Sequence, residues 1–263
     1  MGYEQITYEI REGVAWIRLN RPDKLNALTS KLASETMEAL EETASDAAVR
    51  CVVITGEGRG FSAGQDLTEF QAEQEGGTLD VSRHLRSGYN RMIGQIARLQ
   101  KPVVAGVNGV AAGAGLSLAL ACDVRIASDA ARFTQAFIKI GLVPDSGGTY
   151  LLPRVVGFAK AVELSITGDV VDAAEALRMG LVSRVVPAAE FAAELERYAT
   201  TLAEMPTRAI GATKVLMAEG LRSSLDETLE REAVAQAEHA GSADFLEGVQ
   251  AFLEKRPPRF TGR

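Results

Sequence analysis

An uncharged stretch of 21 residues from Pro102 to Cys122 constrains the fold more than any other part of the chain. It opens with the β-branched residues of a buried strand, Val103, Val104 and Val107. The pattern breaks at Asn108-Gly109, crosses further glycines, and continues as an apolar helix over Leu116–Ala121. A strand, a glycine-rich turn and a helix start leave backbone N–H groups without partners near one point. The stretch therefore predicts a group of donors for an anion or an oxyanion.

Three other interpretations of this stretch are open from its residues alone. Its length suits a membrane span, but four glycines and a strand-to-helix break in its middle argue against one. A dinucleotide-binding turn requires G-x-G-x-x-G, whereas the spacing here is G-x-x-x-G-x-G, and no suitably placed acidic residue follows. The glycines could also serve close backbone packing alone.

Composition narrows the class of protein. The chain has 263 residues, 46% of them hydrophobic, which is enough to bury one sizeable core. A net charge of −7 disfavours nucleic acid and anionic membranes as partners. Cys51 and Cys122 lie in apolar patterns typical of reduced core thiols, and the two histidines lie far apart, which argues against a zinc site. We therefore expect a cytoplasmic globular protein that binds no metal.

Strand, glycine-turn and helix patterns alternate through the first part of the chain. The expected strands cover residues 3–10 and 14–19, joined as a hairpin, and residues 51–55, 103–107, 124–127, 132–137 and 181–186. A helix capped by Thr29 or Ser30 is expected to end near residue 44. A long helix is expected from Asp80 to just before Pro102, and another begins near Asp145. We expect the polar residues 71–80 to be mobile.

Helical patterns alone fill the end of the chain, over residues 188–204, 207–220, 223–239 and 243–254. We therefore divide the chain near residue 200 into an α/β core, residues 1–200, and a helical C-terminal region, residues 201–263. Four apolar residues of this region would be poorly buried on one chain: Phe245, Val249, Phe252 and Leu253. They predict an assembly of several copies.

Two glycine-rich turns follow two buried strands, at Gly60–Gln65 and Gly109–Gly115. If the strands are neighbours in one sheet, each turn can donate an N–H group to the same oxygen. Two such donors stabilise a carbonyl that becomes an enolate by about 3 kcal/mol each. Such a site suits a thioester, whose enolate is otherwise hard to form at neutral pH.

With these motifs the chain resembles the crotonase, or enoyl-CoA hydratase/isomerase, superfamily. The resemblance covers nearly the whole chain and is carried by segments in fixed order: Asn20–Pro22, Phe61–Leu67, Asn108–Asp123, Gly141–Gly148, Leu181–Val182 and Gly248–Arg256. It implies a spiral of ββα units whose C-terminal helices assemble homotrimers or homohexamers. It also implies acyl-CoA substrates and no cofactor, because the coenzyme A belongs to the substrate.

By position, the resemblance assigns the oxyanion donors to the backbone N–H groups of Gln65 and Ala114, and a catalytic carboxylate to Asp145. It places twelve residues at the substrate or its coenzyme A: Lys24, Leu25, Asn26, Ala27, Ala63, Gly64, Asp66, Leu67, Gly113, Ser117, Phe137 and Lys255. From the residues alone, Asp145 also suits an N-cap and Asp66 a turn or cap. His84 is expected on a solvated helix face, and Lys255-Arg256 suits either solvated charge or a phosphate contact.

Two departures from the family pattern direct the functional hypothesis. Hydratases of this family carry glutamates where this chain has Ser117 and Phe137. Adding water to a double bond needs one group to deprotonate the water and another to protonate carbon, whereas isomerisation needs only one proton carrier. We therefore expect an acyl-CoA isomerase with Asp145 as that carrier. The aromatic branch of the family is the most similar, and Phe137 would line an aromatic pocket or belong to the core.

The expected reaction is conversion of 1,2-epoxyphenylacetyl-CoA to the oxepin-CoA, a double-bond shift in enoyl-CoAs, or both. Three alternatives remain. The first is an enoyl-CoA hydratase of general fatty-acid degradation. The second uses Asp145 as a nucleophile, as in halobenzoyl-CoA dehalogenation, although those relatives carry Trp at Phe137 and His at Asn90. The third is a catalytically silent acyl-CoA-binding scaffold.

Overall fold

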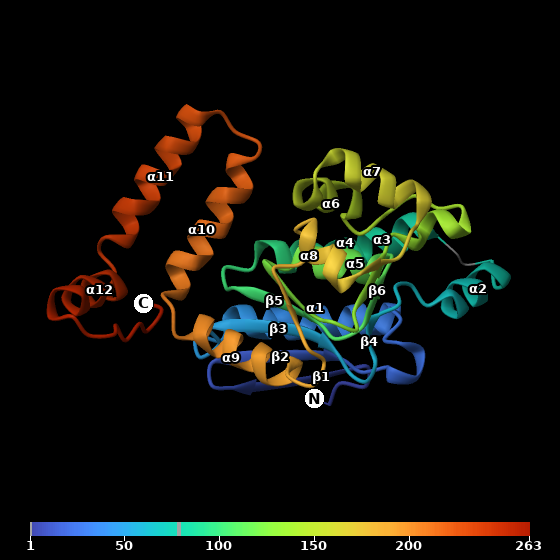
Figure 1. Ribbon diagram of the computed structural model, residues 1–263, viewed down its shortest axis with the longest axis horizontal. Helices are drawn as coiled ribbons and strands as arrows, with labels where there is room; N and C mark the ends of the chain where they lie inside the picture. The colour runs from blue at the N-terminus through green and yellow to red at the C-terminus, as the bar shows by residue number, and fades with distance from the viewer. Residues whose placement is uncertain (1, 78–79) are drawn as a thin grey trace.

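A computed structural model describes residues 2–77 and 80–263 as an α/β body with a helical arm (Figure 1). The strands are β1 (Ile6–Arg11), β2 (Val14–Leu19), β3 (Cys51–Gly56), β4 (Gly60–Ser62), β5 (Val103–Val107), β6 (Val110–Ala112), β7 (Val124–Ser128), β8 (Arg132–Thr134), β9 (Val171–Asp172) and β10 (Arg184–Val186). Within these residues, no helix combines the length and apolarity needed to cross a membrane.

The helices fall into two groups along the chain. Those before residue 180 are η1 (Pro22–Lys24), α1 (Ser30–Ser45), α2 (Leu67–Glu75), α3 (Val81–Ser87), α4 (Tyr89–Arg98), α5 (Ala114–Ala121), η2 (Ala136–Ile140), α6 (Gly148–Val156), α7 (Phe158–Thr167) and α8 (Ala173–Arg178). Those after it are α9 (Phe191–Ala203), α10 (Thr207–Gly220), α11 (Leu225–His239) and α12 (Ala243–Glu254). This order confirms the predicted α/β class, the hairpin and the helical end of the chain.

The larger sheet is buried on both faces. Its six strands have the order β1-β2-β3-β5-β7-β10, and all neighbours except β1 and β2 are parallel. Side chains alternate between the faces, so Val52 and Ile54 of β3 join one core cluster while Cys51 and Val53 join the other. The central strands β3 and β5 are continuous apolar runs, because neither of their faces meets water, whereas the edge strand β1 is partly exposed.

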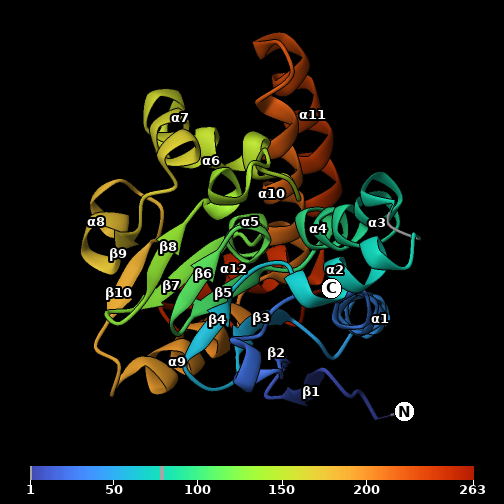
Figure 2. The same cartoon turned by 90° about the vertical axis from the view of Figure 1, so that its right-hand side faces the viewer.

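Helices cover the two faces of this sheet. Helix α9 packs on one face through Phe191, Leu195 and Ala199. Helices α1, α4 and α5 pack on the other, and Figure 2 shows α5 and α9 on opposite sides of the strands. Thr29 begins α1 as predicted, since its hydroxyl accepts a hydrogen bond from the Leu32 N–H at 3.0 Å.

A smaller sheet, ordered β4-β6-β8-β9, brings the two glycine-rich turns together. Strands β3 and β5 are parallel neighbours, and β4 and β6, which directly follow them, also pair in parallel. At Gly109 the two connections nearly touch, because a Cβ there would lie 2.0 Å from the Arg59 carbonyl oxygen. The prediction that the turns lie side by side is thereby confirmed.

Two local expectations were wrong, and a third stays a prediction. The expected long helix is broken at Gly88 into α3 and α4, because Gly88 adopts φ −110° and ψ −95°. The strand expected over residues 132–137 ends at Thr134, so Phe137 lies in the 3₁₀ helix η2. The mobility expected for residues 71–80 is the prediction that stays open: residues 71–75 belong to α2, and residues 78–79 lie outside the described residues.

The division of the chain near residue 200 stays a prediction. That position falls inside α9, which packs on the large sheet. Helices α10, α11 and α12 then extend from the body as an arm (Figure 1).

We predict that Gly109→Ala destabilises the protein, because backbone atoms on the neighbouring connection cannot move away from the added methyl group. Overpacking of this kind costs about 1–3 kcal/mol or more. Gly241→Ala is the matched control, since the nearest atom to its added carbon lies 3.9 Å away. Urea unfolding of both variants checks this, and equal stabilities would contradict the close approach.

Candidate active site

Two backbone N–H groups, those of Gln65 and Ala114, have no hydrogen-bond partner among the described residues. Around Gln65 the neighbouring groups are engaged, since Leu28 donates to the Gly64 carbonyl and Asp66 donates to the Leu28 carbonyl. Ala114 begins α5, so its N–H belongs to the unpaired first turn of a helix. These are the two groups that the sequence assigned to an oxyanion.

Gly64 brings these two turns together. Its φ of +89° lies in the region that favours glycine, and a Cβ at Gly64 would stand 2.7 Å from the Ala112 carbonyl oxygen. The same added atom would lie 3.4 Å from the Ala114 nitrogen. The Gly64–Gln65 turn is therefore packed directly against the start of α5.

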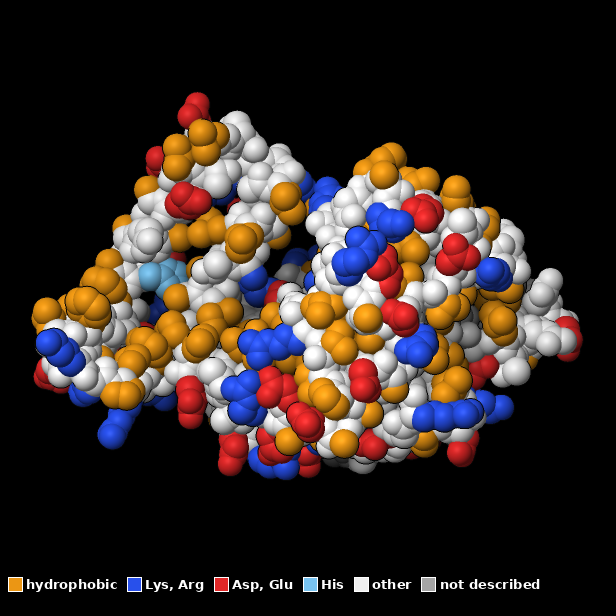
Figure 3. Space-filling view, viewed as in Figure 1, with side chains coloured by type: hydrophobic (Ala, Val, Ile, Leu, Met, Phe, Trp, Pro, Cys, Tyr) orange, Lys and Arg blue, Asp and Glu red, His pale blue; other side chains and the backbone are white. Residues whose placement is uncertain are grey.

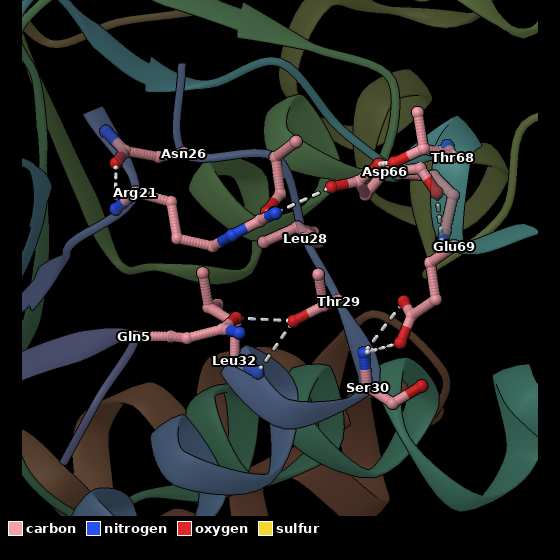
Figure 4. Close-up of polar contacts among 12 residues, drawn as sticks. Gln5, Arg21, Asn26, Leu28, Thr29, Ser30, Leu32, Asp66, Thr68 and Glu69 are labelled. Carbon is pink, nitrogen blue, oxygen red and sulfur yellow. Dashed lines mark hydrogen bonds and ion pairs between the residues drawn. The ribbon is translucent and has the colours of Figure 1, made fainter. Parts of the chain in front are cut away.

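An ion pair between Arg21 and Asp66 fixes the residue that follows Gln65 in this turn (Figure 4). Arg21 contacts the Asp66 carboxylate at 2.7 Å, and Asp66 caps α2 by accepting from the Thr68 N–H at 3.0 Å. Burial by itself would raise the pKa of Asp66, but hydrogen bonds from Thr68 and Arg21 outweigh it and lower the pKa to about 2. Asp66 is thus a capping carboxylate that stays ionised.

The segment from Lys24 to Ala27 lies beside the same turn. Asn26 is fully buried, and its amide donates to the carbonyls of Glu57 and Gly60 at 2.9 and 2.8 Å. Leu25 accepts a hydrogen bond from the Ala63 N–H at 2.9 Å. Lys24 is exposed and Ala27 is buried. In this segment Asn26 fixes the backbone, and its amide is engaged with Glu57 and Gly60.

Asp145 lies in the loop before α6, but it does not cap that helix. The N-cap is Gly147, and Asp145 instead accepts a hydrogen bond from the Ser146 hydroxyl at 2.8 Å. The N-cap interpretation was therefore wrong. Burial raises the pKa of Asp145, although the Ser146 hydroxyl and the charge of His84 act against it. A carboxylate with a raised pKa is suited to taking up and returning a proton.

His84 was expected on a solvated face, and the structure corrects this. Its Nε2 atom is buried, with no hydrogen-bond partner in residues 2–77 and 80–263. The ring packs edge-on against Tyr89, with the ring centroids 4.9 Å apart. The Tyr89 hydroxyl donates to the Leu28 carbonyl at 2.9 Å, beside Gln65. Helical spacing predicted Tyr89 as core, but it did not indicate that His84 faces the same side.

Ser117 and Phe137 line the other side of the site. Ser117 is fully buried on α5, and its hydroxyl donates to the Asp145 carbonyl at 3.1 Å. Phe137 is almost fully buried, and its ring would lie 3.6 Å from a Cβ at Gly113. The start of α5 thus links the Ala114 donor to both the aromatic ring and the loop of Asp145.

The remaining two residues that the resemblance placed at coenzyme A, Leu67 and Lys255, lie in different parts of the molecule. Leu67 is exposed at the start of α2, directly after Asp66. Lys255 is the C-cap of α12, which lies on the arm, away from α5 within one chain (Figure 1). Arg256 is bound to Glu247 and Glu254 on that arm. In the described part of the chain, no cluster of three or more His, Cys, Asp or Glu residues suits a metal ion.

Comparison with known proteins identifies the family of this chain. Residues 9–263 match the model of the enoyl-CoA hydratase/isomerase family. A probable enoyl-CoA hydratase of Rhodobacter capsulatus is 46% identical over 263 residues, which is 100% of both chains. The 1,2-epoxyphenylacetyl-CoA isomerase of Escherichia coli is 40% identical over 260 residues, 99% of each chain.

A solved structure gives the same result for the fold. The crystal structure of a putative enoyl-CoA hydratase from Streptomyces coelicolor superimposes with a TM-score of 0.93 at 38% identity, over 100% of this chain and 96% of that one. The crotonase-like fold predicted from the sequence is confirmed. This chain belongs to the enoyl-CoA hydratase/isomerase family, whose members are enzymes.

Proposed function

We propose that this enzyme is an acyl-CoA isomerase that moves a proton within the acyl group of its substrate. The expected reactions are conversion of 1,2-epoxyphenylacetyl-CoA to the oxepin-CoA and double-bond shifts in enoyl-CoAs. The observation that carries the proposal is one half-buried carboxylate with a raised pKa, Asp145, whose residue is bound through its carbonyl to Ser117 on α5, together with the unpaired N–H groups of Gln65 and Ala114. The 40% identity to the epoxyphenylacetyl-CoA isomerase supports the aromatic substrate.

In the proposed mechanism, the thioester carbonyl oxygen accepts hydrogen bonds from Gln65 and Ala114. The Asp145 carboxylate removes a proton from the carbon next to the thioester, and the C–H electron pair moves into the enolate. Each N–H donor stabilises the enolate oxygen by about 3 kcal/mol. In an enoyl-CoA, the same proton returns to a carbon further along the chain while the double bond moves toward the thioester. No atom is gained or lost.

The main alternative is hydration of enoyl-CoAs, which the name of the 46% identical relative favours. Hydration needs two groups that handle protons. Ser117 and Phe137 stand where hydratases of the family carry glutamates, and the Ser117 hydroxyl is engaged with the Asp145 carbonyl. We therefore favour isomerisation over hydration.

We predict that Asp145→Asn lowers the rate of double-bond shift in a 3-enoyl-CoA by about 10²–10⁴-fold, because the amide cannot take up the proton. The same loss is expected with 1,2-epoxyphenylacetyl-CoA. Purified protein is assayed with both compounds and with crotonyl-CoA. Asp169→Asn, an exposed aspartate, is the matched control.

Fast hydration of crotonyl-CoA that survives in Asp145→Asn would overturn the isomerase proposal. Tight acyl-CoA binding without turnover of any of these compounds would favour the silent scaffold. Release of halide from a halobenzoyl-CoA would favour the nucleophilic role of Asp145.

We predict a pH dependence that reports Asp145. Burial raises the pKa of Asp145, and the carboxylate form is the one that removes the proton. As the pH is lowered, kcat/KM should therefore begin to fall at a pH above about 3.9, the ordinary pKa of an aspartate. His84→Gln should move this acid limb to still higher pH, since it removes the charge that lowers the pKa of Asp145. Rate measurements across the pH range check both statements. If the pH at which kcat/KM falls were unchanged or lower in His84→Gln than in the wild-type protein, the predicted effect of His84 would be contradicted.

We also propose that the chain assembles into homotrimers or dimers of trimers through its arm. In Figure 3, apolar side chains lie along the surface of the arm formed by α10, α11 and α12. On a single chain, 84% of Phe252 and 74% of Leu253 are exposed on α12, and Leu225 and Val234 of α11 are exposed as well. A surface of this kind favours contact with a second copy.

Phe252→Asp should weaken this assembly, because burying an unpaired carboxylate at a subunit contact is unfavourable. Light scattering during gel filtration is expected to show smaller species than for the unaltered protein. Val170→Asp, at an exposed apolar residue of the body, is the control and should leave the mass unchanged. A wild-type protein that elutes as a monomer would contradict the proposal.

A further inference from the structure

Gln135 carries a buried side-chain amide without hydrogen bonds. The residue is 1% exposed, and neither its Oε1 nor its Nε2 has a partner in the described ranges. Within those ranges it is the one side chain with two such atoms. Buried polar groups in native proteins are paired with protein, water or ligand, so this amide calls for a partner.

The Gln135 amide lies beside Ser117 and the first residue of α6. A Cβ at Gly148, the first residue of α6, would lie 2.9 Å from the Ser117 Oγ and 3.4 Å from the Gln135 Nε2. Ser117 in turn donates to the Asp145 carbonyl. Two residues after Gln135 comes Phe137, whose ring faces Gly113 beside the Ala114 donor. The unpaired amide is therefore enclosed by the same residues that surround the proposed proton carrier.

We propose that Gln135 and Ser117 form a buried hydrogen-bonding subsite for an uncharged oxygen atom of the acyl group. This inference rests on the proposed acyl-CoA function, and it adds a substrate class: acyl groups with an ether, epoxide, ketone or hydroxyl oxygen near the reacting carbon. The Gln135 Nε2 donates to such an oxygen, and its Oε1 accepts from a hydroxyl. The two side chains are neutral, so they do not compensate for the burial of a charged group.

The subsite predicts discrimination against hydrocarbon acyl groups. When a hydrocarbon fills the same space, the amide loses access to water and gains no partner. Sites built to bond a substrate oxygen reject analogues that lack it for this reason. A single amide is expected to provide about 10-fold discrimination or more, which corresponds to one hydrogen bond left unmade.

The test compares two ligands that have neither a double bond nor a leaving group on the β carbon, cyclohexylacetyl-CoA and oxan-3-ylacetyl-CoA, in which one ring CH₂ is replaced by oxygen. Calorimetry on the full-length protein should give a Kd at least about 10-fold lower for the oxygen-containing ligand. In Gln135→Met, which keeps the length of the side chain but not its polar atoms, the two Kd values should become similar. Gln250→Met, an exposed glutamine of α12, should preserve the wild-type ratio.

A wild-type protein that binds both ligands equally, or a ratio that persists in Gln135→Met, would overturn the proposal. Thermal unfolding of Gln135→Met adds a second readout, since removing unpaired buried polar atoms should leave the midpoint unchanged or raise it. A marked loss of stability in Gln135→Met, together with equal binding of the two ligands by the wild-type protein, would indicate that the amide holds a fixed water molecule instead of a ligand oxygen. The Asp145→Asn assay with a 3-enoyl-CoA tests the isomerase function separately, so the two failures are distinguishable.

Discussion

The close contact between two glycine-rich connections is the constraint on which the candidate site depends. Parallel pairing of β3 with β5 places the ends of these strands at one edge of the sheet, where ligands bind in many α/β proteins. The connections then approach so closely that only hydrogen fits at Gly109 and Gly64. Because the backbones touch, the Gly64–Gln65 turn lies directly against the residue whose N–H group starts α5, Ala114.

Two aspartates near this contact have opposite environments. Asp66 is bound by Arg21 and Thr68, which lower its pKa and keep it ionised as a structural cap. Asp145 is half-buried and forms no ion pair within the described part of the chain, so burial raises its pKa. Carboxyl groups whose environments move their pKa values apart commonly have different roles. Here the environments support Asp66 as an anchor and Asp145 as the proton carrier.

Much of the fold could be predicted from local patterns. The apolar run of β3, the Thr29 cap and the four last helices all depend on residues close together in the chain. The errors arose where distant contacts decide. Phe137 continues an apolar pattern beyond β8, yet the chain turns into η2 there. Asp145 precedes helix α6, but the N-cap of that helix is Gly147. Nothing in the pattern around His84 indicated that its ring would pack on Tyr89.

The sequence by itself determined most of the strands and the glycine turns, because periodicity and glycine spacing act over a few neighbouring residues. The proposed role of the Gln65 and Ala114 N–H groups came from the resemblance to the family. Only the tertiary structure decided the state of the side chains around those donors. Asp145, His84 and Gln135 acquire their properties from burial and from partners on other elements. Ser117 donates to the carbonyl of Asp145, which lies 28 positions later in the chain. The pattern of neighbouring residues cannot show that two such distant residues are in contact.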